Sequence, residues 1–286
     1  MKNLIAFTID ENYIEPFIVA IQSFTLHHNV DKYIIALIHS NIAENKIRKI
    51  KKFFQKINLL LVVKKIKNDF EGIKVGYHFN SVIFYRLLLS DIFNDYERIL
   101  YIDSDIIFLD NIDKLFHLNL KDNVLAAIPK HNYYMIPKHL EGKVQKYFAS
   151  GLLLINTKKF IDFGISDKCI YFLRNSKYEM PDQDALNVAV DKWLELDLSY
   201  GVETAFLESN NDELKIKIQN PKIIQFSGSS KPWHFRNKHP YKHLYWRYLR
   251  MTSFKRYIPV DLTVVNIIKW MIPKRIKDVL KRHKIK

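Results

Sequence analysis

The chain has little cysteine and little glycine. Of its 286 residues, one is cysteine, Cys169, and seven are glycine. A single cysteine excludes an intramolecular disulfide framework and a zinc site built from several thiolates, and it fits a reducing compartment. The glycines form no Gly-x-Gly-x-x-Gly pattern. The sequence is therefore not that of a standard dinucleotide-binding fold.

The N-terminus lacks a long apolar run, and the whole chain is short of acidic residues. Asp10 follows after only a few apolar residues, too soon for a signal peptide or a membrane span, so we expect a cytoplasmic protein. The 45 Lys and Arg outnumber the 30 Asp and Glu, which gives a formal net charge of +15. Such a charge calls for an anionic partner, either nucleic acid, an acidic membrane or a phosphorylated substrate. Charge alone does not choose among these.

The chain is rich in apolar residues, and short apolar runs alternate along it with segments of helical spacing. It is 48% hydrophobic and 14% aromatic, enough for a large core. Apolar runs predict strands, and apolar residues at helical spacing predict helices. The strands expected first are 4–8, 33–38, 59–66 and 99–102, and the helices are 13–28, 44–54 and 81–93. This alternation predicts an α/β fold with a mainly parallel central sheet flanked by helices.

The second half of the chain is less regular. Further strands are expected at 124–128, 152–155 and 223–226, with a connecting loop or lid at 130–146. Asp182, after Pro181, is the expected capped start of a helix that runs to about Trp193. There are no internal repeats and no low-complexity linkers, and the composition shifts near residue 257. We therefore predict one large domain over residues 1–256 and a basic helical tail over 257–286.

Two carboxylates, Asp103 and Asp105, follow the strand expected at 99–102. In open α/β sheets the carboxyl ends of the strands are where ligands bind. Asp-x-Asp places both side chains toward one side of an extended chain, where they repel unless a cation lies between them. Mg²⁺ or Mn²⁺ would offset the repulsion between the two carboxylates and would also neutralise a diphosphate. The alternative is an ordinary polar junction between a strand and a loop.

Several further segments, taken together with this pair, resemble glycosyltransferase family 8, and within it the bacterial lipooligosaccharide galactosyltransferases and glucosyltransferases. The matching segments are Thr8–Tyr13, Phe84–Leu88, Tyr101–Asp105, Gly151–Asn156, Asp182–Asn187 and Gly228–Trp233. They occur in the family's order over most of the chain. The resemblance implies a nucleotide-diphosphate-sugar transferase (GT-A-like) fold, a UDP-hexose donor, Mn²⁺ dependence and retention of configuration at the anomeric carbon.

The residues near the first strand suggest a nucleoside pocket. Asp10 can accept a hydrogen bond from a uracil N–H, Asn12 can bond the ribose or base, and Tyr13 offers a face for base stacking. Thr8 belongs to the same matched segment. These positions resemble the family's uridine pocket. The alternative is that Asp10 caps a helix and Tyr13 is a core residue.

The other matched positions would contact the rest of the donor. Arg86 resembles the family's arginine that touches the donor, although it could instead pair with Asp91 or Asp95. Ser104 would present its backbone and hydroxyl to the ribose. Lys231, beside Gly228, can reach a phosphate, because glycine permits close backbone approach and lysine adds charge. The alternative for the segment 228–231 is an ordinary turn.

The reaction itself cleaves a glycosyl–phosphate bond through an oxocarbenium-like state. A covalent retaining route needs a carboxylate beneath the sugar ring, and the candidate region is Asp182-Gln183-Asp184. The resemblance places Gln183 nearest the anomeric carbon, which favours a same-face mechanism in which the leaving phosphate helps to deprotonate the acceptor. Asp182 would bind sugar hydroxyls or hold Gln183. Both acids could instead simply favour a helix N-terminus. His78 is the candidate acceptor-binding residue.

Two positions depart from the family pattern. The family usually has a histidine that completes the metal site, and here that place holds Gln225. Glutamine would make the site all-oxygen and narrow the preference for Mn²⁺ over Mg²⁺. The family also favours asparagine where this chain has Ala149, which could alter the choice of sugar. Either departure could instead mark a degenerate site.

The tail over 262–286 combines apolar residues with basic ones. The apolar residues are Val264, Ile267, Ile268, Trp270, Met271 and Ile272, and the basic residues are Lys274, Arg275, Lys277, Lys281, Arg282, Lys284 and Lys286. This pattern predicts a helix that lies on an anionic membrane surface, bent near Pro273. It is too charged and interrupted to span the membrane. The alternative is a helix packed on the domain with a solvated basic end.

The sequence thus predicts a metal-dependent retaining transferase that moves galactose or glucose from a UDP-sugar to a lipooligosaccharide or lipopolysaccharide acceptor. We expect it peripherally bound at the inner face of the cytoplasmic membrane, with no nucleic-acid partner, and its oligomeric state is left open. The competing interpretation is a catalytically silent basic protein that binds anionic membrane or nucleic acid on the same fold. Asp103, Asp105 and Gln183 distinguish the two, since an idle fold has no reason to keep them together.

Overall fold

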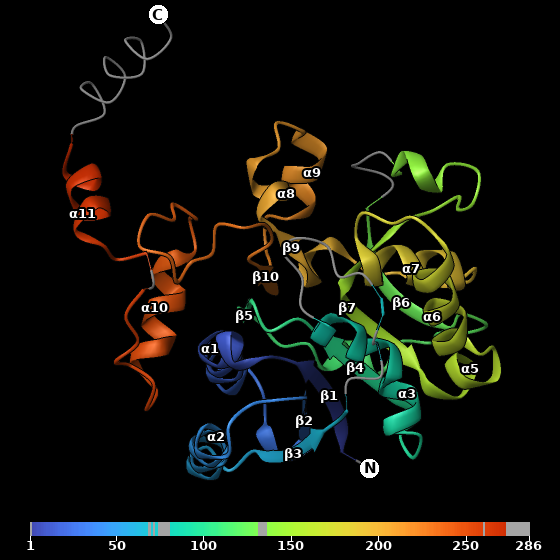
Figure 1. Ribbon diagram of the computed structural model, residues 1–286, viewed down its shortest axis with the longest axis horizontal. Helices are drawn as coiled ribbons and strands as arrows, with labels where there is room; N and C mark the ends of the chain where they lie inside the picture. The colour runs from blue at the N-terminus through green and yellow to red at the C-terminus, as the bar shows by residue number, and fades with distance from the viewer. Residues whose placement is uncertain are drawn as a thin grey trace, which may run out of the picture.

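A sheet of seven strands forms the centre of the computed structural model, which describes residues 2–67, 70, 72–73, 81–130, 136–259 and 261–272 (Figure 1). His78 and the basic residues from 274 onward lie outside these residues. The strands are β1 (Asn3–Thr8), β2 (Tyr33–His39), β3 (Leu60–Lys65), β4 (Arg98–Ile102), β6 (Leu125–Pro129), β7 (Phe148–Asn156) and β8 (Trp193–Glu195). Their order is β3-β2-β1-β4-β7-β6-β8.

Most neighbouring strands in this sheet are parallel. β1 pairs in parallel with β2 and with β4, β2 pairs in parallel with β3, and β6 pairs in parallel with β8. β7 runs antiparallel to both of its neighbours, β4 and β6. The prediction of an α/β fold with a mainly parallel central sheet is therefore confirmed.

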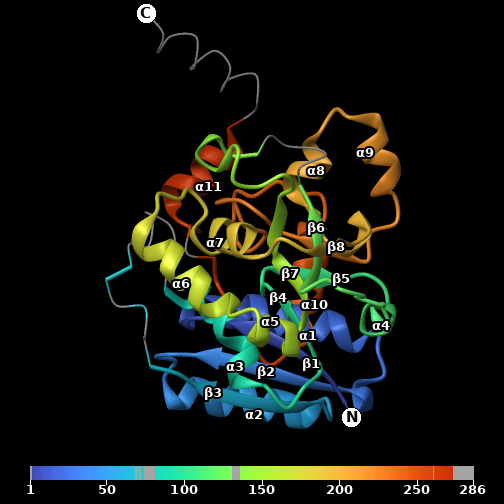
Figure 2. The same ribbon diagram turned by 90° about the vertical axis from the view of Figure 1, so that its right-hand side faces the viewer.

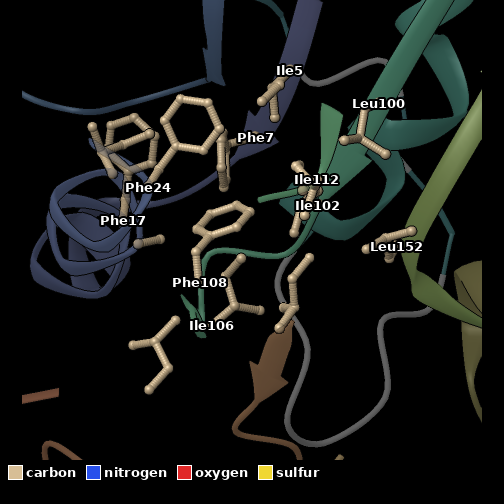
Figure 3. Packing of buried hydrophobic residues seen from close by; sticks show 14 of the residues in the cluster. Ile5, Phe7, Phe17, Phe24, Leu100, Ile102, Ile106, Phe108, Ile112 and Leu152 are labelled. Carbon is tan, nitrogen blue, oxygen red and sulfur yellow. The ribbon is translucent and has the colours of Figure 1, made fainter. Parts of the chain in front are cut away.

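The sheet separates two apolar cores because side chains alternate between the faces of a strand. Ile5 and Phe7 of β1 belong to one core, and Leu4 and Ala6 belong to the other. In the first core, aromatic rings of β1, β5 (Ile106–Phe108) and α1 (Ile14–Thr25) converge (Figure 3). Phe7 and Phe17, for example, meet edge to face with their centroids 5.1 Å apart. All of β1 beyond its first residue is buried, as expected for a strand covered on both faces.

The helices flank the sheet and also form the two ends of the molecule. They are α1, α2 (Glu44–Lys56), α3 (Leu89–Ile92), α4 (Asp113–Phe116), α5 (Thr157–Asp162), α6 (Ile165–Asn175), α7 (Pro181–Ala189), α8 (Thr204–Glu208), α9 (Asp212–Lys217), α10 (Lys242–Arg250) and α11 (Val264–Met271). α2 lies at one end of the molecule, and α8 and α9 lie at the other (Figure 2).

Two helix predictions need correction. The expected helix at 81–93 is a 3-10 helix, η3 (Ser81–Leu88), followed by the single turn of α3. α7 ends at Ala189 and not near Trp193, which begins β8. Its N-cap is Met180, without a side-chain cap, and Pro181 occupies the first turn. In the described part of the predicted loop at 130–146, a 3-10 helix at Lys138–Leu140 is the only regular element.

A second, smaller sheet brings distant segments to the end of β4. β10 (Ile223–Gln225) pairs antiparallel with β5 and parallel with β9 (Val202–Glu203). Gln225 stands opposite Ile106, and the backbone N–H of Phe226 donates to the carbonyl of Asp105 at 2.8 Å. This pairing places the loop after β10 beside the Asp-x-Asp segment.

The last helix of the described chain, α11, stands apart from the sheet (Figure 1). Several of its apolar side chains face solvent, with Val264 72% and Met271 69% exposed. No helix within the described residues is long and apolar enough to cross a membrane. The boundary near 256 remains a prediction, as does the role of the tail.

Candidate active site

The candidate site forms where β1 and β4 end side by side. The two strands pair in parallel, so their carboxyl ends lie at the same edge of the sheet. At this edge the hydroxyls of Thr8 and Tyr101 lie 3.3 Å apart, and the Tyr101 hydroxyl donates to Asp103 Oδ1 at 2.6 Å. Ser104 and Asp105 follow and are both buried. The apolar run of β4 thus leads into two carboxylates at this edge, of which Asp105 is buried and Asp103 is 24% exposed at its side chain.

Arg86 joins the Asp-x-Asp segment to the start of α7. Its guanidinium lies 3.0 Å from Asp103 Oδ1 and 3.0 Å from Asp182 Oδ2. It also stacks over the ring of Tyr101, 4.5 Å from the centroid. Arg86 is 6% exposed, so these charge-assisted contacts lie largely out of water, where they are strong. The alternative pairing of Arg86 with Asp91 or Asp95 is wrong, because the arginine binds acids that are distant in sequence.

Ser150 connects the same groups, and the sequence interpretation missed it. Its carbonyl and hydroxyl both accept from Arg86 Nη1, at 2.9 and 3.0 Å. Its hydroxyl donates to Asp182 Oδ2 at 2.7 Å, and its backbone N–H donates to Gln183 Oε1 at 3.1 Å. The only available signal was its position beside Gly151. A methyl group at residue 151 would lie 2.9 Å from Asp103 Oδ2 and would overlap the Gln225 amide, so any larger residue there would displace these two side chains.

The Asp103 and Asp105 carboxylates have the features of a divalent-cation site. Burial raises the pKa of Asp103 to about 6 against the attraction of Arg86, and the neighbouring Asp105 adds to the rise. Asp105 Oδ1 is buried and has no hydrogen-bond partner among the described residues, which is costly for a carboxylate oxygen. An oxygen-binding cation such as Mg²⁺ or Mn²⁺ fits this donor set. Within the described residues, no group of three or more His, Cys, Asp or Glu side chains is arranged so that it could hold a metal ion by itself.

Gln225 and Lys231 complete the polar surroundings of this pair. Gln225 donates through Nε2 to Asp103 Oδ2 at 3.0 Å. The predicted role as a metal ligand needs the amide oxygen, which a half-turn of the amide would place there. The Lys231 ammonium lies 2.5 Å from Asp105 Oδ2 and 2.6 Å from the carbonyl of Phe226. Gly228 adopts φ +85°, a left-handed turn that glycine favours. Both a phosphate loop and an ordinary turn are compatible with that geometry.

The predicted nucleoside pocket lies at the end of β1. Asp10 Oδ1 accepts from the backbone N–H of Asn12 at 2.9 Å and so caps the 3-10 helix Glu11–Tyr13. The alternative interpretation, that Asp10 caps a helix, is therefore confirmed. Tyr13 is only partly buried, and its ring meets Trp233 edge to face at 5.8 Å. Binding of a base by these residues remains a prediction.

The three residues of the Asp182–Asp184 segment differ in how they are used. Asp182 faces Arg86 and Ser150, as described above. Gln183 is 8% exposed, and both polar atoms of its amide have partners. Asp184 is fully buried and accepts hydrogen bonds from Tyr147, His139 and the backbone N–H groups of Glu179 and Met180. It is therefore not available as a nucleophile in this arrangement.

Comparisons with known proteins agree with this geometry. Residues 4–237 match the sequence model of Glycosyl transferase family 8. General stress protein A of Bacillus subtilis is 29% identical over 209 residues, which are 65% of this chain and 71% of that protein. Lipopolysaccharide 1,2-glucosyltransferase of Escherichia coli is 26% identical over 297 residues, which are 98% of this chain and 86% of that protein.

The fold also has solved counterparts. The crystal structure of galactosyltransferase LgtC in complex with donor and acceptor sugar analogues superposes with a TM-score of 0.75 at 21% identity. That superposition covers 90% of this chain and 98% of LgtC. Its fold is of the GT-A type. Because the family match spans most of the chain and includes every residue of the cluster around Arg86, the chain belongs to glycosyltransferase family 8 and is a glycosyltransferase.

Proposed function

We propose that the chain is a retaining hexosyltransferase that moves galactose or glucose from a UDP-sugar to a lipooligosaccharide or lipopolysaccharide acceptor. The observation that carries this proposal is the bridge made by Arg86 between Asp103 and Asp182. A single guanidinium thus contacts both Asp103, which is suited to a cation and diphosphate, and Asp182, which is suited to sugar hydroxyls. The acceptor class is supported by the lipopolysaccharide glucosyltransferase of Escherichia coli, which aligns with nearly the whole chain.

The donor would lie across the carboxyl edge of β1 and β4. Asp10, Asn12 and Tyr13 would hold the uridine, with Thr8 and Ser104 beneath it. Lys231 and the turn at Gly228 would contact the diphosphate, since a lysine held at a glycine turn can approach a phosphate closely. Asp182 and Arg86 would hold the hexose. His78, proposed for the acceptor, lies outside the described residues.

The burial of Asp184 favours the same-face route over double displacement. A covalent intermediate needs a carboxylate free to attack the anomeric carbon, and Asp184 is saturated by hydrogen bonds. On the same-face route the bond from the anomeric carbon to the phosphate oxygen breaks as the bond to the acceptor oxygen forms on the same side. The acceptor proton passes to the departing phosphate oxygen. The carbonyl of Gln183 stabilises the positive charge that develops at the anomeric carbon.

Asp103 and Asp105, with Gln225 if its amide turns, would hold the divalent cation. When bound, Mn²⁺ or Mg²⁺ supplies positive charge that stabilises the diphosphate leaving group. The same ion would satisfy Asp105 Oδ1. The protein's own contribution at this point is Lys231, whose ammonium lies beside Asp105 and can turn to the phosphate.

Hexose transfer to purified lipooligosaccharide tests the function directly. The purified chain, supplied with Mn²⁺ and with UDP-galactose or UDP-glucose, should add one α-linked hexose, detected by mass spectrometry and by the anomeric coupling constant in NMR spectra. A β-linked product would refute retention. Tight binding of the acceptor without any transfer from either donor would favour the catalytically silent alternative.

The role of Gln225 gives a prediction about metal choice. We expect activity with Mg²⁺ as well as Mn²⁺, because an amide oxygen suits both ions whereas an imidazole favours the later transition metal. We also expect little loss of metal affinity at about pH 6.5, where an unperturbed histidine would be half protonated. Gln225→His should restore a preference for Mn²⁺, as measured by calorimetric titration. If Gln225→Ala binds Mn²⁺ as tightly as the parent, Gln225 is not a ligand.

The tail gives a prediction about membranes. The exposed apolar side chains of α11, with the basic residues that follow, suit the surface of the inner membrane leaflet, and each basic residue near an anionic surface adds about 1 kcal/mol. Deletion of residues 262–286 should release the protein from anionic vesicles at moderate salt and leave hydrolysis of UDP-sugar measurable. Co-sedimentation measures this release. Failure of the full chain to bind such vesicles, or tighter binding to duplex DNA, would contradict the membrane assignment.

A further inference from the structure

The orientation of the Gln183 amide is fixed from both ends. Its Oε1 accepts from the backbone N–H of Ser150 at 3.1 Å, on the side of the Arg86 cluster. Its Nε2 donates to the hydroxyl of Tyr147 at 2.9 Å, on the opposite side. An amide has one oxygen end and one nitrogen end, and only the oxygen end can stabilise a positive charge. Which end faces the donor is therefore decided by these two partners.

The Tyr147 hydroxyl can accept a hydrogen bond from Gln183 because its own proton points to another acceptor. The hydroxyl donates to Asp184 Oδ1 at 2.6 Å, so a lone pair is left for the Gln183 N–H. Burial, together with the hydrogen bond to Asp184, raises the pKa of Tyr147, which keeps this proton in place. A flipped amide would set the Gln183 oxygen against that lone pair and the NH₂ against the Ser150 N–H. Both contacts would be repulsive.

Asp184 is held in turn by a residue of the segment between β6 and β7. His139 Nε2 lies 2.9 Å from Asp184 Oδ2, and its Nδ1 lies 3.3 Å from a carboxylate oxygen of the exposed Glu179. The backbone N–H groups of Glu179 and Met180 also donate to Asp184 Oδ2, at 2.8 and 3.0 Å. Because these donors occupy Oδ2 of Asp184, the hydrogen bond from the Tyr147 hydroxyl is accepted by Oδ1.

We propose that Tyr147, held by Asp184 and His139, is a positioning residue that points the carbonyl oxygen of Gln183 toward the donor sugar. The proposal rests on the assignment of Gln183 to the anomeric carbon and deepens it. Tyr147 need not touch the substrate. It acts by making one of the two amide orientations unfavourable, and so keeps the negative end of the amide dipole where the oxocarbenium-like charge develops.

Tyr147→Phe is the direct test, because it removes one hydroxyl and keeps the ring. We expect kcat to fall about tenfold, the equivalent of one lost hydrogen bond, with little change in KM for the UDP-sugar. Tm should fall as well, because the buried Asp184 Oδ1 loses its donor. The matched control is Tyr245→Phe on α10. Its hydroxyl is buried and has no hydrogen-bond partner among the described residues, so its kcat should stay within twofold of the parent.

Two further variants separate positioning from simple packing. His139→Ala should lower kcat about threefold and His139→Gln, which keeps an N–H donor, should restore it. In ¹⁵N-labelled protein the Gln183 side-chain NH₂, assigned with Gln183→Ala, should be protected from exchange in the parent and lose that protection in Tyr147→Phe. This spectrum needs no turnover, so it stands even if the proposed reaction fails. A Tyr147→Phe variant with parental kcat, or with unchanged Gln183 protection, would overturn the proposal.

Discussion

Asp105→Asn should abolish most hexose transfer and leave the fold intact. The substitution removes the negative charge at a buried oxygen that has no hydrogen-bond partner among the described residues, and that oxygen is the one best placed for a cation. Asp105 would hold the cation that stabilises the departing diphosphate, and loss of one group on which such stabilisation depends costs about 10²–10³ in kcat. Asparagine has nearly the same shape, and the contact of Phe226 with the residue 105 carbonyl uses the backbone, so the fold should persist. Tm should fall, because the Lys231 ammonium loses the charge of a carboxylate 2.5 Å away.

The matched control for this variant is Asp110→Asn, two residues beyond the end of β5. Asp110 pairs with Lys222 at 3.2 Å and is 60% exposed at its side chain. A surface pair of this kind contributes little, so both kcat and Tm should stay near the parental values. Steady-state transfer in Mn²⁺ and circular dichroism measure the two quantities. Near-normal turnover of Asp105→Asn would remove the Asp-x-Asp pair from the site.

Arg86→Met should be the most destabilising single change in the site. It leaves Asp103 and Asp182 without the cation that lies 3.0 Å from each. Removing one member of a buried ion pair costs about 3–5 kcal/mol, because the remaining charge stays out of water. Arg86→Lys keeps the charge but not the planar fork that reaches both acids. Its stability should therefore fall between that of the parent and that of Arg86→Met.

Arg98→Met provides the comparison for this pair of variants. Arg98 is partly buried, and its guanidinium donates to the carbonyls of Phe116 and Leu118, which carry no charge. Its loss should cost about 1–3 kcal/mol. Urea unfolding at neutral pH measures each free energy. If Arg86→Met costs no more than Arg98→Met, the two acids do not depend on Arg86 and its proposed bridging role fails.

The parts of the site that the sequence predicted are those that follow uninterrupted apolar runs. β4 is such a run, and its abrupt end at Asp103 correctly located the acids at the edge of the sheet. β7 was recognised only from residue 152, because Ala149, Ser150 and Gly151 interrupt its apolar pattern. The strand in fact begins at Phe148. Ser150, which contacts Arg86, Asp182 and Gln183, was missed for that reason.

Tertiary contacts explain the remaining differences. The acids that follow Arg86 most closely in sequence are Asp91 and Asp95. Its partners instead lie just after β4 and at the start of α7, which no local pattern relates to it. β5 and β9 are too short to be recognised as strands in the sequence. In the structure each pairs with β10, a contact that a local pattern does not reveal. Residues 81–93 have helical spacing, but the first part is a 3-10 helix, from which Arg86 reaches the carbonyl of Ser150 in β7.

Release of UDP from a panel of UDP-sugars, with and without Mn²⁺, is the most direct test of the central claim that this edge of the sheet binds and cleaves a UDP-hexose. We predict release from UDP-galactose or UDP-glucose that requires the divalent ion and that is about 10²–10³-fold slower in the Asp105→Asn variant. Equal release without the ion, or no release from any UDP-sugar while the protein still binds anionic membranes, would contradict it.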